Sequence, residues 1–78
     1  MADIVDKIMA EFESDPLISA KSLNLVVGST GFLRRRKTLE VLGTTESSAE
    51  KDRAMEIVQR QAGDGYEVQD KIVVIGNR

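Results

Sequence analysis

The sequence predicts an α+β fold in which two helices pack on one face of a three-stranded mixed sheet. Apolar residues recur with a helical period near residues 4–12 and 54–62, and at every second position in three other stretches. The expected order is helix, strand, strand, helix, strand. A chain of 78 residues makes one small domain, which we take as residues 1–78.

A first helix is expected over residues 3–13. Asp3 can accept a hydrogen bond at its N-terminus, and Ile4, Ile8 and Phe12 share one face. Pro16 should end the segment because proline disfavours helical backbone in the residue before it.

A second helix is expected from Ser47 to about Ala62. Ser47 and Glu50 have the spacing of a capping box. Gly63 is a typical residue just beyond a helix C-terminus.

Three strands are expected, over residues 23–27, 38–43 and 68–75. The first two should form an antiparallel hairpin, with Gly28-Ser29-Thr30-Gly31 as its turn. The second helix can then act as a crossover to the third strand. The expected core comprises Ile4, Ile8, Phe12, Leu23, Leu25, Val27, Leu39, Val41, Ala54, Ile57, Val58, Val68, Ile72 and Val74.

The composition argues against an enzyme. The chain has no cysteine and no histidine, which removes thiolate metal sites and the commonest general base. We therefore expect no catalytic residues, cofactor or metal. No apolar stretch approaches the ~20 residues of a membrane span, and the first residues do not resemble a signal peptide. These features fit a cytoplasmic chain or an excised domain.

The most unusual feature is the basic run Arg34, Arg35, Arg36 and Lys37. Such a run can contact the phosphates of a phospholipid surface or of nucleic acid. Three aromatic residues are few for stacking on bases, which disfavours nucleic acid. The alternative is a solvated hairpin end whose charge keeps an edge strand from pairing.

A second candidate surface follows from the strand alternation. Asn24, Thr38, Glu40, Gln69 and Lys71 are expected on the sheet face that the helices leave open. Four aliphatic residues are assigned to the same face: Val26, Leu42, Val73 and Ile75. Such a patch can dock on a partner protein or on a second copy of the chain. The alternative is that these residues satisfy β propensity alone.

The chain resembles the BON domain family across nearly its whole length. The resemblance rests on Asp15-Pro16-Leu17, on Leu39-x-Val41-x-Gly43-x-Thr45 and on Val68-x-Asp70-x-Ile72-x-Val74. It implies a non-catalytic module that engages phospholipid surfaces or partner proteins, in an envelope protein for most relatives. Some relatives are linked to potassium sensing. The basic run lengthens the hairpin turn beyond the short one usual in that family.

The sequence thus favours a binding module for an anionic phospholipid surface or a protein partner. A nucleic-acid-binding module and a small-ion (potassium) sensor are the alternatives, and the aliphatic face allows a weak homodimer.

Overall fold

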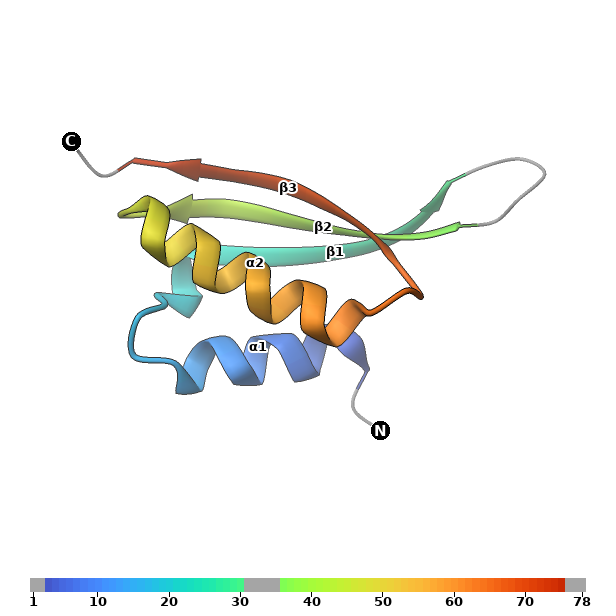
Figure 1. Ribbon diagram of the computed structural model, residues 1–78, viewed down its shortest axis with the longest axis horizontal. Helices are drawn as coiled ribbons and strands as arrows, with labels where there is room; N and C mark the ends of the chain where they lie inside the picture. The colour runs from blue at the N-terminus through green and yellow to red at the C-terminus, as the bar shows by residue number, and fades with distance from the viewer. Residues whose placement is uncertain (1–2, 31–35, 76–78) are drawn as a thin grey trace.

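The structure is a computed structural model that describes residues 3–30 and 36–75. It confirms the predicted α+β fold, with a three-stranded mixed sheet (Figure 1). Its elements are α1 (Ile4–Ser14), the short helix η1 (Ala20–Ser22), β1 (Leu23–Thr30), β2 (Arg36–Thr45), α2 (Ser48–Ala62) and β3 (Glu67–Val74).

The sheet has the order β1-β2-β3. Strand β2 pairs antiparallel with β1 and parallel with β3, and α2 is the crossover between the parallel strands. Both helices lie on the same side of the sheet, with α2 over β2 and β3 and α1 beside α2 (Figure 1). The other face carries no further layer of the described chain.

Both predicted N-caps are present. The Asp3 carboxylate accepts a hydrogen bond from the Asp6 N–H at 3.0 Å, and the Ser47 hydroxyl accepts one from the Glu50 N–H at 3.2 Å. Such bonds satisfy backbone donors that have no partner within the helix. At the other end of α2, Gly63 has a φ of 57°, a conformation that glycine adopts without steric cost.

Glu50 departs from the predicted capping box. Its side chain is buried, and its two carboxylate oxygens accept hydrogen bonds from the N–H groups of Ser19, at 2.8 Å, and Glu46, at 2.9 Å. It does not bond back to Ser47, as a capping box requires. Glu50 therefore fastens the chain before β1 to the start of α2, a role that its spacing did not predict.

Most of the predicted core is buried between the helices and the sheet. The buried members are Ile8, Phe12, Leu23, Leu25, Leu39, Val41, Ala54, Ile57, Val58 and Ile72, while Ile4 and Val68 are partly buried against them. Val27 and Val74 were wrongly assigned to the core, because they are 44% and 38% exposed. Ile18 was missed: it lies in the connection after α1 and is buried.

The predicted turn at Gly28 is also wrong. Strand β1 continues through Gly28 to Thr30, and the pairing with β2 runs out to Thr30 opposite Arg36. The two strands therefore form a longer arm than the sequence indicated, and the connection between them lies outside the described residues.

Candidate binding surfaces

The arm formed by β1 and β2 extends beyond both helices (Figure 1). Val26 and Val27 point to opposite faces of the arm, yet each is nearly half exposed. Gly28 and Ser29 are exposed as well. Val27 is on the edge strand β1, and it stays exposed although its partner Leu39 on the central strand is buried.

The predicted basic run falls only in part within the described residues. Arg34 and Arg35 fall outside the described residues, and Arg36 is the first residue of β2. Lys37 is exposed and pairs with Ser29 across the arm. Its Nζ lies 5.7 Å from the centre of the Tyr66 ring, within the range of a cation–π contact. Lys37 thereby links the arm to the segment that leads into β3.

The open face of the sheet carries the predicted aliphatic residues. Val26, Val73 and Ile75 are 45%, 59% and 57% exposed, and Leu42 is half-buried. In the register, Leu42 on the central strand is diagonal to Val26 on one side and to Val73 on the other. Val26, Leu42 and Val73 therefore form a line across the sheet rather than a compact patch, and Ile75 follows Val73 just beyond the end of β3. We call it the aliphatic line.

A charged pair lies beside the aliphatic line. Lys71 Nζ is 3.6 Å from the Glu40 carboxylate, and both side chains remain partly exposed. Lys71 lies directly opposite Leu42 in the register. Thr38, which was expected to be solvated on this face, is 3% exposed. Its hydroxyl oxygen lies 3.3 Å from where a Cβ on Gly28 would be, so the missing side chain of Gly28 leaves room for Thr38 to fold over β1.

On both edge strands, a side-chain oxygen accepts a hydrogen bond from a backbone N–H group. The Asn24 side-chain oxygen accepts a hydrogen bond from the Leu25 N–H at 2.9 Å, and Asp70 accepts one from the Ile72 N–H at 3.0 Å. Ile75 donates its N–H to Thr45 on β2. Because donors alternate along a strand, the Ile72 N–H points away from β2, toward the free edge. Both edges are thus less able to accept a further strand.

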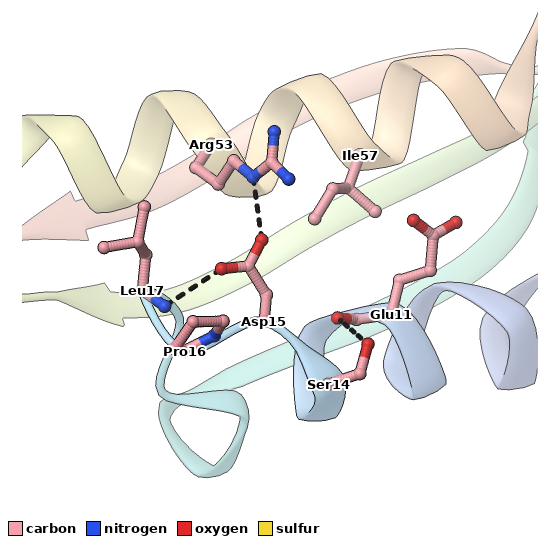
Figure 2. Close-up of a pocket in the computed structure, with 7 residues that line it drawn as sticks. All are labelled: Glu11, Ser14, Asp15, Pro16, Leu17, Arg53 and Ile57. Carbon is pink, nitrogen blue, oxygen red and sulfur yellow. Dashed lines mark hydrogen bonds and ion pairs between the residues drawn. The ribbon is translucent and has the colours of Figure 1, made fainter.

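The helix side of the molecule has a groove of about 450 Å³ that the sequence analysis did not single out. Figure 2 shows that it is lined by the end of α1, the following turn and α2. Arg53 Nε donates to the Asp15 carboxylate at 2.7 Å, and the Leu17 N–H donates to the same carboxylate at 2.9 Å (Figure 2). These bonds hold the pKa of Asp15 below its usual value, with Arg53 as the largest cause.

The charged side chains that line this groove form ion pairs and hydrogen bonds within the fold. Arg53 also contacts Glu56 at 3.3 Å, so two carboxylates share its guanidinium. Glu11 accepts hydrogen bonds from Gln61 and Arg60 on α2, and these lower the pKa of Glu11, the Gln61 bond being the largest cause. The groove therefore reads as a junction between α1 and α2. The Asp15-Pro16 sequence was the one available signal for it.

Two further features bear on function. Among residues 3–30 and 36–75, no group of three or more acidic side chains is placed to hold a metal ion. Neither described helix is long and apolar enough to cross a membrane.

Comparisons with protein-family models, curated proteins and solved structures find no match to this chain. The resemblance to the BON family therefore stays a prediction.

Proposed function

We propose that this protein is a non-catalytic binding module that attaches to an anionic phospholipid surface through the end of the β1–β2 arm. The observation that supports the proposal is the position of the basic run. Pairing of β1 with β2 out to Thr30 and Arg36 carries this end of the sheet beyond both helices, and Arg34 and Arg35 directly precede Arg36 in the sequence. A net charge of −2 then does not prevent local attraction to an anionic surface.

The electrostatic free energy of four cations is large enough to attach the chain to an anionic surface. Each Lys or Arg close to an anionic bilayer contributes about 1 kcal/mol, so the four cations supply about 4 kcal/mol. The exposed Val26 and Val27 lie at the base of the same arm. In the sequence, Phe32 and Leu33 directly precede the cations. Apolar residues next to cations are typical of segments that bind at the membrane interface.

A second candidate function is docking on a protein partner through the open face of the sheet. It is favoured by the exposure of Val73 and Ile75 on a face that no described element covers. The resemblance to the BON family implies the same two kinds of ligand.

Co-sedimentation with vesicles tests the proposal. The protein is mixed with zwitterionic vesicles and with vesicles of the same size that contain anionic phospholipid, at low and high salt. We expect binding to anionic vesicles only, and weaker binding in high salt because salt screens the charges. Equal binding to both vesicles, or binding that does not respond to salt, contradicts the proposal.

An oligonucleotide competitor separates the remaining alternative. If the protein binds the oligonucleotide tightly and does not bind vesicles, the nucleic-acid function replaces the one proposed. If vesicles bind and the oligonucleotide displaces the protein only at high concentration, the phospholipid function stands.

A further inference from the structure

We propose that the open face of the sheet is a homodimer interface, on which a second copy of this chain docks about a two-fold axis. The axis passes near Leu42, in the plane between the two sheets. This inference concerns a different surface from the cationic end of the arm. It does not depend on phospholipid binding.

The edges of the sheet do not offer the same opportunity. Asn24 and Asp70 occupy backbone donors on β1 and β3, and Asp70 also pairs with Lys51 at 3.2 Å. Polar and charged side chains of this kind are how natural sheets avoid edge pairing. The open face differs from the edges, since it exposes Val26 on β1 and Val73 and Ile75 on and just after β3. The structure therefore favours association through the face over strand addition.

The register arranges this face in two parallel diagonals. Val26, Leu42 and Val73 occupy successive diagonal positions on β1, β2 and β3, which is the aliphatic line. Glu40 and Lys71 occupy the neighbouring diagonal, on β2 and β3, and contact each other at 3.6 Å. One diagonal is thus apolar, and the adjacent one carries one negative and one positive charge.

This pattern is complementary to itself. A two-fold axis perpendicular to the aliphatic line reverses its direction, so Val26 faces Val73 of the second copy and Leu42 faces Leu42. The same operation reverses the charged diagonal, so Glu40 faces Lys71 of the second copy and Lys71 faces Glu40. In an isologous interface every contact occurs twice, and here each one joins apolar to apolar or opposite charges. The strands of the two copies cross at a steep angle, as in orthogonally packed sheets.

The area of the face sets the strength of the dimer. Three strands about 4.8 Å apart and eight residues long, at about 3.3 Å per residue, cover a footprint of about 380 Å². A standard interface buries about 800 Å² on each partner. The dimer is therefore weak.

Sedimentation velocity of the whole chain, from about 10 µM to about 1 mM, measures this association in the range expected for a small interface. We expect the weight-average mass to rise from that of a monomer toward that of a dimer. The variant Leu42→Lys/Val73→Lys should remain monomeric throughout. A wild-type chain that remains monomeric at the highest concentration overturns the proposal.

Charge exchange tests the pairing itself. Glu40→Lys and Lys71→Glu each place like charges opposite one another in the dimer, so each alone should raise the dissociation constant at least tenfold. An equimolar mixture of the two variants should dimerise again, because the cations of one then face the carboxylates of the other. Lys21→Glu, an exposed change in η1, is the control and should dimerise as the wild type does. Circular dichroism and a urea titration establish that each variant is folded. If both charge variants dimerise like the wild type, or if their mixture does not recover, the proposed interface is wrong.

Discussion

The carboxylate of Asp15 binds the guanidinium of Arg53 at 2.7 Å across 38 residues of sequence. Its other oxygen accepts the Leu17 N–H, so one side chain both orders the turn after α1 and fastens it to α2. The side chain of Asp15 is 8% exposed, whereas that of Arg53 is 40% exposed. This ion pair positions the connection that leads into β1, and through it the start of the arm.

The stability of the fold should depend on pH through Asp15. Its pKa is lowered in the folded chain, chiefly by Arg53 and then by the Leu17 N–H. A lowered pKa means that the stabilisation is present above the unfolded-state pKa of about 3.9 and is lost as the pH falls through the folded-state value. Asp15→Asn should therefore lower the urea midpoint at pH 7 and have little effect below pH ~3.

The exposed Asp52 on α2 supplies the control for this prediction. Asp52→Asn should leave the urea midpoint nearly unchanged at both pH values. If Asp15→Asn shifts the midpoint by the same amount at neutral and at acidic pH, its ionisation is not the source of the stability.

Gly43 on β2 should not tolerate a side chain. Its φ is 125°, and a Cβ at this position would lie 2.1 Å from the carbonyl oxygen of Ser22. The clash is with backbone, so β1 would have to move away. Gly43→Ala should lower the free energy of unfolding by more than about 2 kcal/mol, or prevent folding, because strain in a disfavoured backbone region is added to the clash.

Gly63 provides a matched comparison. It also has a positive φ, of 57°, but no atom lies within 4 Å of the position its Cβ would take. Gly63→Ala should cost about 1–3 kcal/mol from backbone strain alone, less than Gly43→Ala, because no contact is added to the strain. Chemical denaturation of both variants measures the difference. Equal losses would show that the contact with Ser22 is not what requires glycine at position 43.

Glu50 should resist even a conservative change. Each of its two oxygens accepts a backbone hydrogen bond, and glutamine offers one oxygen in place of two. Glu50→Gln should leave the N–H of Ser19 or of Glu46 without an acceptor, at a cost of about 1–3 kcal/mol. Glu56→Gln on the exposed side of the same helix should change the urea midpoint by far less. A loss no larger than that of Glu56→Gln would contradict the bridging role of Glu50.

The sequence predicted those parts of the fold that depend on local periodicity. Ile8 and Phe12 repeat at helical spacing and are buried, and Leu39 and Val41 alternate and are buried. The caps Asp3 and Ser47 were predicted for the same reason, since a cap acts over three residues. Ile18 was missed because it belongs to a connection with no period.

Errors arose where burial depends on how far a distant element reaches. Val27 and Val74 have the parity of core residues, but they lie on the edge strands and are 44% and 38% exposed. The exposed fraction of such a residue follows from helix length and placement, which alternation does not encode. Gly28 was likewise misassigned to a turn, whereas it continues β1 and pairs with Thr38 on β2.

The same distinction between local pattern and tertiary structure holds for the candidate surfaces. Parity correctly assigned Val26, Val73 and Ile75 to an exposed face. It could not reveal the Glu40–Lys71 pair, which depends on the register between β2 and β3. Nor could it show that Lys37 lies over Tyr66, because these residues meet only once β3 is in place.

The central claim, attachment through the cationic end of the arm, is tested most directly by vesicle binding of two charge-matched variants. Arg34→Gln/Arg35→Gln and Lys7→Gln/Lys21→Gln each remove two positive charges, the first pair from the basic run and the second from α1 and η1. At about 1 kcal/mol per cation, the arm variant should bind anionic vesicles about 30-fold more weakly than the wild type. The second variant should bind within about twofold of the wild type, since its charges lie away from the surface. Equal weakening of both variants would show that net charge, and not the basic run, determines binding, and would contradict the account.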